Sequence, residues 1–316
     1  MNIISIITPC LNEESNVELF YNAIINCFSD IDNYDFELIF VDDGSTDNTA
    51  EIMSEIANRD RRCKVIIHAR NFGVYRSSFN ALQFATGVAT IPLMPVDLQD
   101  PPEVIPKFII EWEKGFLVVA GARYQREEAF IMKKIRHAYY ILVSKLSDYD
   151  LPKYVGEFQL IDATIVKELQ KIDDYYPYTR GLIASVTNKR TIIEYVWRKR
   201  KLGKSNMNLW KLIDQGLNGV VSVSTAPLRV LTLISFLTSV LGISFGFIQV
   251  AAHFAFAKSI TPPGTSTIII MIGFFAAVNA ITLGVIAEYI GAMHAQLRGR
   301  SRVIILHTLN IESSSK

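Results

Sequence analysis

Four segments of polar side chains each follow a short apolar run in the first third of the chain. They begin at Thr8, Asp42, Arg70 and Asp97 and have the sequences TPCLNEE, DDGSTD, RNFG and DLQDPPE. Carboxylates at a strand end can accept hydrogen bonds from a base or a ribose, and a glycine permits close approach of a ligand. Each segment alone also fits an ordinary turn or helix start, which Asp, Ser and Pro favour. The four together indicate ligand-binding loops.

The elements that must position these loops are visible in the alternation of residue types. Short β-rich runs at 3–8, 36–41 and 65–68 alternate with amphipathic helical patterns at 16–28 and 48–58. Such alternation predicts an α/β domain with a mostly parallel sheet and crossover helices. In these sheets ligands bind beyond the carboxyl ends of the strands, where the polar segments fall.

Two long apolar runs follow in the last third of the chain. Residues 230–257 contain no Lys, Arg, Asp or Glu, and a second run covers 268–287 after the helix-breaking TPPGT. About 20 apolar residues cross a bilayer core of roughly 30 Å, so we expect a transmembrane hairpin with helices at about 228–256 and 267–290. The alternative is a pair of buried helices in a soluble core.

Basic residues flank the hairpin on both sides while the connecting loop holds only Lys258. The positive-inside rule therefore predicts that both termini are cytoplasmic.

The chain is thus expected to divide into a cytoplasmic domain at 1–226, the hairpin at 227–292 and a cytoplasmic tail at 293–316. Two segments at about 131–146 and 205–222 mix apolar and basic residues at helical spacing. They are expected to be amphipathic helices on the membrane surface, although core packing produces similar stripes. The predicted location is the cytoplasmic (inner) membrane, crossed twice.

Composition excludes several other classes of protein. With 32 Lys+Arg against 31 Asp+Glu the net charge is +1, so nucleic acid is not an expected partner. A hydrophobic content of 50% excludes a disordered chain. The three cysteines have no CxxC spacing, which argues against a disulfide framework or a zinc site and fits a reducing compartment.

The four polar segments, in this order and at these strand ends, resemble the family 2 glycosyltransferases of the dolichol-phosphate mannose synthase and bactoprenol (undecaprenyl-phosphate) glucosyltransferase type. The resemblance extends over nearly the whole chain, through the segments GAR at 121–123, VGEF at 155–158, TRGL at 179–182, RKRKLGKS at 198–205, PLR at 227–229 and GVIAEYIG at 284–291. It implies a GT-A-like, nucleotide-sugar-binding α/β domain with interfacial helices and a two-helix transmembrane hairpin.

The resemblance also implies roles for individual residues. The nucleotide-sugar donor would be bound by Pro9, Leu11, Glu13, Asp43, Arg70, Gly73 and Asp97. An acceptor phosphate near the membrane would be bound by Arg123, Arg136, Arg200, Lys204 and Ser205. Guanidinium and ammonium groups suit a phosphate acceptor, but the same basic residues also suit anionic lipid head groups. Both interpretations stay open.

The chain departs from the family pattern at two positions. The family's Asp-x-Asp metal motif is reduced here, because Pro95 stands at the first position and leaves Asp97 as a catalytic and metal-binding carboxylate with Gln99 as a neutral ligand. Mg²⁺ or Mn²⁺ is therefore expected to be weakly held. At the second position Glu157 replaces the usual Asp, and Gln159 replaces the following Arg. Glu157 is either the catalytic carboxylate or a structural acid.

These features predict an inverting, metal-dependent hexosyltransferase of cell-envelope glycan or lipid-linked sugar synthesis. It would move a sugar from a UDP-linked donor to polyprenyl phosphate at the cytoplasmic face of the lipid bilayer, and a homo-oligomer is compatible with the sequence. One alternative acceptor is a hydroxyl of a lipid-linked glycan, which would require a general base. The other alternative is a non-catalytic membrane protein that binds a sugar nucleotide.

The acceptor assignment predicts the behaviour of an Arg200→Ala variant. Transfer to lipid phosphate should fall strongly while UDP binding stays nearly intact, because a charge-assisted contact at the acceptor does not shape the donor site. Transfer assays and UDP titration of the same preparation measure both. An equal loss of nucleotide affinity would contradict the assignment.

Overall fold

Runs of β-branched and aromatic residues build a mixed sheet at the centre of the molecule. The computed structural model describes residues 1–125, 147, 149–150, 152, 155–198, 224–255, 264–299 and 301–311. Within these residues the sheet has eight strands in the order β7-β5-β6-β4-β1-β2-β3-β8. The strands are β1 (Asn2–Cys10), β2 (Tyr34–Asp42), β3 (Cys63–His68), β4 (Ala89–Ile91), β5 (Val118–Gln125), β6 (Val155–Asp162), β7 (Arg190–Val196) and β8 (Ile305–Leu309).

The central strands are parallel, as the alternating pattern predicts. β1 pairs in parallel with both β2 and β4, and β2 pairs in parallel with β3. Chain order runs outward from β1 to β3 on one side, while β4 lies on the other side of β1. The sheet therefore has a topological switch point between β1 and β4, and ligands of such sheets bind at the carboxyl ends of strands beside that point.

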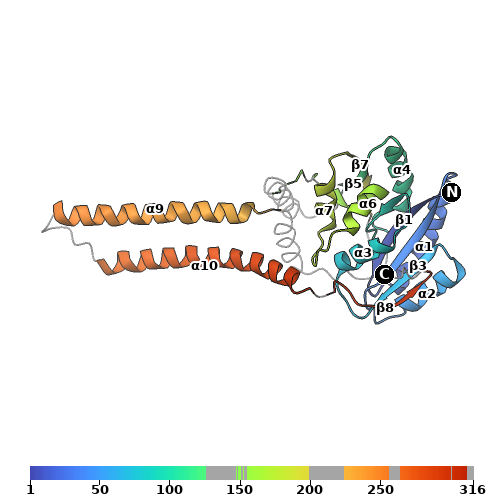
Figure 1. Ribbon diagram of the computed structural model, residues 1–316, viewed down its shortest axis with the longest axis horizontal. Helices are drawn as coiled ribbons and strands as arrows, with labels where there is room; N and C mark the ends of the chain where they lie inside the picture. The colour runs from blue at the N-terminus through green and yellow to red at the C-terminus, as the bar shows by residue number, and fades with distance from the viewer. Residues whose placement is uncertain are drawn as a thin grey trace.

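Helices cover both faces of the sheet (Figure 1). One face packs against α1 (Glu14–Phe28), α2 (Thr49–Arg59) and α4 (Ile105–Glu113), and its core includes Phe20, Phe40, Phe108 and Phe158. The other face packs against α3 (Val74–Ala81), α6 (Ala163–Gln170) and α7 (Thr179–Val186). Short 3₁₀ turns occur at η1 (Leu82–Phe84) and η2 (Pro102–Val104). α1 shows why these segments are helical, because its buried residues recur at the three- and four-residue spacing of one helix face.

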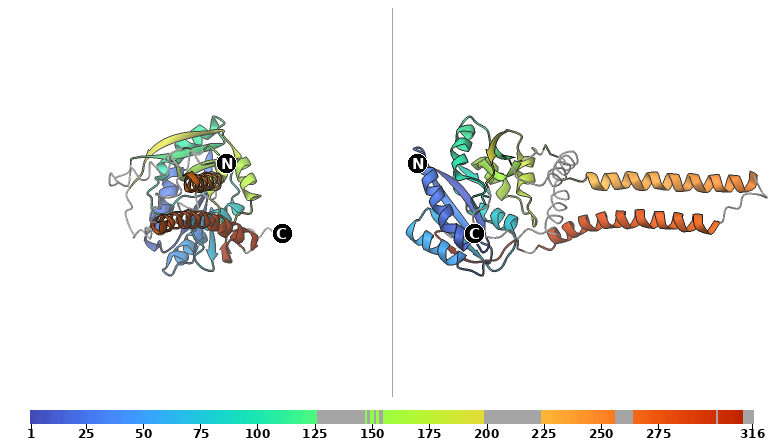
Figure 2. Two further views of the ribbon diagram at one scale, coloured as in Figure 1. Left: turned by 90° about the vertical axis from the view of Figure 1, so that its left-hand side faces the viewer. Right: turned by 180° about the vertical axis from the view of Figure 1, so that it is seen from behind.

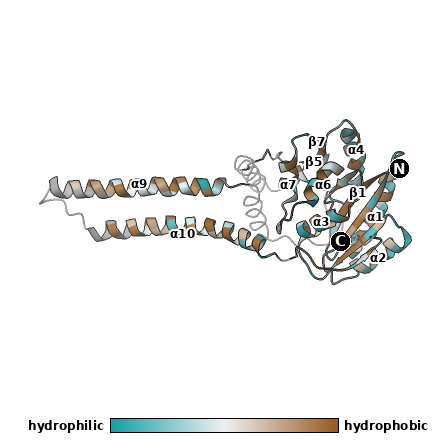
Figure 3. Ribbon diagram, in the orientation of Figure 1, coloured by the Kyte–Doolittle hydropathy of each residue, from teal (hydrophilic) through white to brown (hydrophobic). Residues whose placement is uncertain are grey.

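Two long helices project side by side from one end of this domain (Figures 1 and 2). They are α9 (Ala226–Ala255) and α10 (Gly264–Leu297), each somewhat longer than the sequence predicts. Both have windows long and apolar enough to cross a membrane, and none of either window is buried within the protein. Their apolar surface is extensive (Figure 3). By length and composition these helices fit a bilayer, and because the rest of the protein does not bury them, they do not fit the core of a soluble protein.

The chain after α10 returns to the sheet, which the sequence analysis did not anticipate. β8 lies antiparallel to β3, with Val65 opposite Leu309 and Ile67 opposite His307. Just beyond β8, Asn310 donates from Nδ2 to the carbonyl oxygens of Ala57 (2.6 Å) and Cys63 (2.8 Å). Part of the predicted tail at 293–316 is thus an edge strand, and the sheet extends beyond the predicted 1–226 unit. The two predicted amphipathic helices, 131–146 and 205–222, lie outside the described residues.

Asn310 offers a direct test of this docking. It adopts φ of 56°, so Asn310→Gly and Asn310→Ala both remove the hydrogen bonds to two backbone carbonyls and the one from Arg61 (3.1 Å). Only the Ala variant keeps a Cβ in the left-handed region, which Ala tolerates less well than Asn. We expect Asn310→Gly to cost about 1 to 2 kcal/mol and Asn310→Ala about 1 kcal/mol more. Thermal unfolding of the detergent-solubilised proteins ranks the stability of the two variants and the unaltered chain. Equal melting of both variants and the unaltered protein would mean that β8 does not support the sheet.

Candidate active site

A buried carboxylate, Asp43, holds together the ends of β2 and β3 and the start of α3. Four donors of the described chain meet its oxygens: His68 Nδ1 (3.1 Å), Ser77 Oγ (2.7 Å) and the amides of Phe72 (3.0 Å) and Gly73 (2.8 Å). Burial alone would raise the pKa of Asp43, but these hydrogen bonds outweigh burial and lower it. An ionised carboxylate can only accept, so His68 must carry its proton on Nδ1.

The predicted donor loops after β1 and β2 are joined by hydrogen bonds. The Asn12 amide donates to Ser45 Oγ (3.0 Å), and the Thr46 amide donates to Asn12 Oδ1 (2.8 Å). The Glu13 amide donates to Thr49 Oγ1 (2.8 Å) at the start of α2. The two loops therefore form one unit, which contains the predicted donor residues Pro9, Leu11, Glu13 and Asp43.

Two glycines let a third loop join this unit. Gly44 has φ of +77°, and a Cβ there would lie 2.6 Å from the backbone carbonyl carbon of Arg70. Gly73 has φ of +96°, a conformation that favours glycine, and its amide donates to Asp43. The loop from Arg70 to Gly73 thus packs directly on the DDGS turn. The exposed Arg70 guanidinium stacks 4.2 Å from the Phe72 ring centroid.

The loop after β4 carries the predicted metal ligands. Asp97 Oδ1 accepts a hydrogen bond from the Gln99 amide (3.1 Å) across Leu98, which has φ of 57°. Gln99 in turn binds the backbone of Arg198, because its carbonyl accepts from the Arg198 amide (2.9 Å) and its Nε2 donates to the Arg198 carbonyl (3.4 Å). The loop therefore directly holds the first residue of the basic segment 198–205.

Arg123, a predicted acceptor ligand, already has a carboxylate partner. Its Nε and Nη2 bind both oxygens of Asp100 (3.2 and 2.9 Å), whose side chain is almost completely buried, and Tyr195 Oη donates to the same carboxylate. Burial would lower the pKa of Arg123, but the Asp100 charge raises it, so the guanidinium stays charged. Trp197 stacks on it at 5.4 Å. Nη1 makes no hydrogen bond with the described part of the chain.

Glu157 is a poorly solvated acid beside this guanidinium. On β6 it alternates with Phe158, which packs into the core against Phe108 at 4.8 Å between ring centroids. Glu157 Oε2 is shielded from water and accepts no hydrogen bond from the described residues. Burial raises the pKa of Glu157 above 4.5, although the charges of Arg180 and Arg123 oppose the shift. Such a carboxyl is suited to exchanging a proton or meeting a cation.

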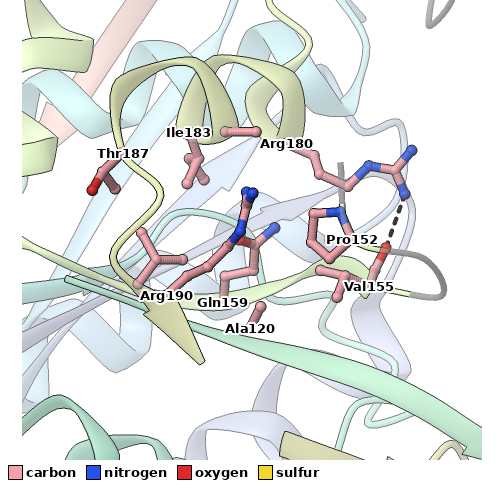
Figure 4. A pocket seen from close by; sticks show the side chains of 10 residues that line it. Ala120, Pro152, Val155, Gln159, Arg180, Ile183, Thr187 and Arg190 are labelled. Carbon is pink, nitrogen blue, oxygen red and sulfur yellow. Dashed lines mark hydrogen bonds between the residues drawn. The ribbon is translucent and has the colours of Figure 1, made fainter. Parts of the chain in front are cut away.

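A separate cavity of about 10 Å³ lies between β5, β6 and α7 (Figure 4). Gln159 and Arg190 extend into it from the sheet, and Ile183 closes it from α7. Arg180, also on its wall, donates from Nη1 to the Val155 carbonyl (2.8 Å). A cavity of this size has room for about one water molecule, so it is a packing defect and not a donor site.

Comparison with known proteins identifies the family. Residues 5–170 match the model described as Glycosyl transferase family 2. The prophage bactoprenol glucosyl transferase homolog of Escherichia coli (strain K12) is 32% identical over 303 residues, which cover 96% of this chain and 98% of that protein. The bactoprenol glucosyl transferase of Shigella phage SfX is likewise 32% identical over 303 residues, with the same two coverages. The chain belongs to glycosyl transferase family 2.

This family 2 enzyme has the predicted α/β fold class, and the expected resemblance is confirmed. Among solved structures, the mannosyl-3-phosphoglycerate synthase of Rubrobacter xylanophilus is 14% identical, with 69% of this chain and 72% of that chain covered and a TM-score of 0.49. That likeness carries no part of the assignment.

The family 2 chain gathers its predicted site residues into two groups. The donor group comprises Pro9, Leu11, Glu13, Asp43, Arg70 and Gly73, on the three joined loops. The second group comprises Asp97 with Gln99 and Arg123 with Glu157, and Asp100, one residue after Gln99, binds Arg123. The remaining predicted acceptor residues, Arg136, Arg200, Lys204 and Ser205, lie outside the described residues.

Sequence reasoning assigned no role to several residues that support these groups. Asp100 and Arg180 lie inside the family-like segments DLQDPPE and TRGL, and this position was the only feature of the sequence that could have indicated a role for them. His68 and Ser77 gave none, because a lone histidine at the end of an apolar strand looks like any core residue. Their function as partners of Asp43 depends on contacts between distant parts of the chain.

Glu157 should trade stability for activity. A raised carboxyl pKa means that the folded state prefers the protonated form, so stability contributed by this group is lost as pH rises through the folded pKa, above 4.5. Glu157→Gln should therefore melt higher than the unaltered protein at pH 8, with a smaller difference at pH 5. Transfer to a hydroxyl acceptor, which needs Glu157 as a general base, should fall by about 10²-fold or more. Melting and rate measurements at both pH values check this, with Glu157→Asp as the charge-retaining control. A Gln variant that melts lower at pH 8 would contradict the burial argument.

Proposed function

We propose that the enzyme transfers a sugar, with inversion, from a UDP-linked donor to a polyprenyl phosphate at the cytoplasmic face of the membrane. The observation that carries the proposal is the hydrogen-bonded union of three donor loops in a chain whose two long apolar helices lack protein cover. The relatives named as bactoprenol glucosyl transferases, matched over nearly their full length, support a lipid-carrier acceptor.

The donor would bind across the joined loops. Asp43 Oδ1 is saturated by three donors, whereas Oδ2 accepts one from Gly73 and keeps acceptor capacity for an N–H of the base. Its lowered pKa keeps it an acceptor at neutral pH. Arg70 is exposed and near enough to this loop to meet donor phosphate charge.

The acceptor would be held mainly by cations. A phosphate monoester has a second pKa near 6, so at neutral pH it is largely ionised and needs positioning more than deprotonation. Arg123 offers Nη1 for this purpose while Asp100 fixes its orientation. Arg136, Arg200, Lys204 and Ser205 would complete the phosphate site.

A hydroxyl acceptor is the second candidate, favoured by one observation. Glu157 has a raised pKa and an oxygen without a hydrogen-bond partner among the described residues, which are properties of a general base. With a phosphate acceptor the same carboxylate would orient and balance the charges of Arg123 and Arg180. The chemical identity of the transfer product distinguishes a hydroxyl acceptor from a phosphate acceptor.

The residues present fit a divalent ion that binds together with the donor phosphates better than an ion held by the protein alone. The described residues contain no cluster of three or more His, Cys, Asp or Glu able to hold a metal. Asp100, the next acid after Asp97, already accepts hydrogen bonds from Arg123 and Tyr195. Mg²⁺ commonly uses one or two carboxylates plus substrate phosphates, which Asp97 with Gln99 would supply. When bound, the ion would neutralise charge on the leaving diphosphate.

The membrane arrangement follows from the same proposal. The domain at 1–226 would lie in the cytoplasm, the hairpin at 227–292 would cross the bilayer twice, and residues 293–316 would return to the cytoplasm. Docking of β8 on β3 agrees with this, because it requires both ends of the hairpin to be on the side of the catalytic domain.

The test is transfer by purified, detergent-solubilised full-length protein offered a panel of nucleotide sugars and polyprenyl phosphate, with mass analysis of the lipid product. Pro95→Asp should lower the metal concentration for half-maximal rate, because it restores a second carboxylate two residues from Asp97. Asp97→Ala should nearly abolish transfer.

Three outcomes would count against the proposal. A product glycosylated on a hydroxyl would select the alternative acceptor. Donor binding without any transfer would indicate a non-catalytic protein. Full activity of Asp97→Ala in excess chelator would exclude the metal-assisted mechanism and leave arginine and lysine to neutralise the diphosphate.

A further inference from the structure

A second pocket, of about 260 Å³, lies where α10 meets the catalytic domain. Its lining residues come from the end of α10 and from the loop between α6 and α7: Tyr175, Tyr176, Gly291, His294, Ala295 and Arg298. None of them belongs to the predicted donor, metal or acceptor sets. The pocket therefore requires an explanation of its own.

The two walls of the pocket are fixed to each other. Gln296 on α10 accepts a hydrogen bond from the Tyr175 amide (2.8 Å) and donates from Nε2 to the Asp173 carbonyl. The Tyr175 ring is also held from behind by Arg76, whose guanidinium carbon lies 4.2 Å from the ring centroid. The space is thus built by the fold and does not depend on a ligand to form it.

The lining chemistry suits an anion. Within the described residues, the wall supplies hydrogen-bond donors from two tyrosine hydroxyls, an imidazole and a guanidinium, and it contains no carboxylate. Gly291 and Ala295 are small residues of the same wall, beside His294 and Arg298, which lie one helical turn apart on the same face. Neither basic side chain forms an ion pair within the described chain. Of the two acids next to the wall, Asp173 is paired with Arg302 (3.2 Å) and Asp174 accepts a hydrogen bond from the Tyr176 amide (2.9 Å).

The pocket also lies at the right depth for a lipid head group. The part of α10 that is long and apolar enough to cross a membrane ends at Leu297, within about 5 Å of both His294 and Arg298 along the helix axis. The head-group layer extends roughly 5 to 8 Å beyond the hydrocarbon core on each side. An arginine at position 298 can extend its side chain back toward that layer, and tyrosines commonly lie in it.

We propose that this pocket binds the phosphate of an anionic phospholipid of the surrounding bilayer, with Arg298 and His294 as its cationic wall and Tyr175 and Tyr176 as donors. This depends on the hairpin crossing a bilayer, but not on which sugar or acceptor the enzyme uses. A bound lipid would press the end of α10 against the Tyr175 loop. Through Arg76, which also stacks on Phe72, that contact reaches the donor loop.

The test measures lipid retention and not transfer, so it can fail without affecting the proposed function. Full-length protein in detergent is titrated with phosphatidylglycerol or phosphatidylcholine and examined by native mass spectrometry. The unaltered protein should retain phosphatidylglycerol preferentially. Arg298→Glu should weaken that binding about tenfold or more, Arg298→Gln nearly as much, and Arg298→Lys less. Lys107→Glu, an equal charge change on the exposed face of α4, should bind like the unaltered protein.

A competition arm separates the two sources of lipid phosphate. Polyprenyl phosphate added at equal concentration should not displace the retained phosphatidylglycerol. Displacement, together with loss of transfer in Arg298→Gln, would assign the pocket to the acceptor and overturn the proposal. Equal phosphatidylglycerol binding by Arg298→Glu and Lys107→Glu would overturn it as well, provided that both variants melt like the unaltered protein.

Discussion

The buried carboxylate of Asp43 is the constraint on which the loops of the proposed donor site depend. It directly follows β2, and its four partners belong to β3, to the loop after β3 and to α3. Removing water from a carboxylate is costly unless several donors replace the solvent, and here they do. The same bonds set the path of the chain from Arg70 to Gly73. An apolar side chain at position 43 would leave the amides of Phe72 and Gly73 unpaired and release the loop from Arg70 to Gly73.

The second half of the site follows a different principle, in which charges are balanced across strands. Asp100 neutralises Arg123 and orients it through a bidentate contact, while Tyr195 and Trp197 shield the pair from water. Glu157 lies in the field of Arg123 and Arg180 but gains no hydrogen bond from the described chain. A carboxylate left in this condition weakens the fold and strengthens the case for a catalytic role, because strain of this kind is usually retained at functional sites.

The hairpin connects these chemical features to a surface. Because β8 docks on β3, the chain enters and leaves the apolar pair on the same side, and the domain cannot swing freely about a single tether. The end of α10 is further joined to the loop between α6 and α7 through Gln296. An enzyme whose acceptor is a lipid gains from such a fixed orientation, since positioning two reactants removes much of the entropy cost of bringing them together.

Much of this organisation could be predicted from the sequence alone. Local periodicity identified β1, α1, β2, α2 and β3, and the length of the apolar runs identified the two long C-terminal helices, because both signals are carried by neighbouring residues. The order of the polar segments sufficed to predict the family, the fold class and the enzyme class. The pairing of side chains was decided by the tertiary structure. Asp43 meets His68 and Arg123 meets Asp100 across more than twenty residues, and Asn310 reaches Ala57 across 253. Such contacts produce no periodic pattern in the sequence. The five residues of β8 are also too few to be predicted as a strand, because they become one only by pairing with the edge of β3.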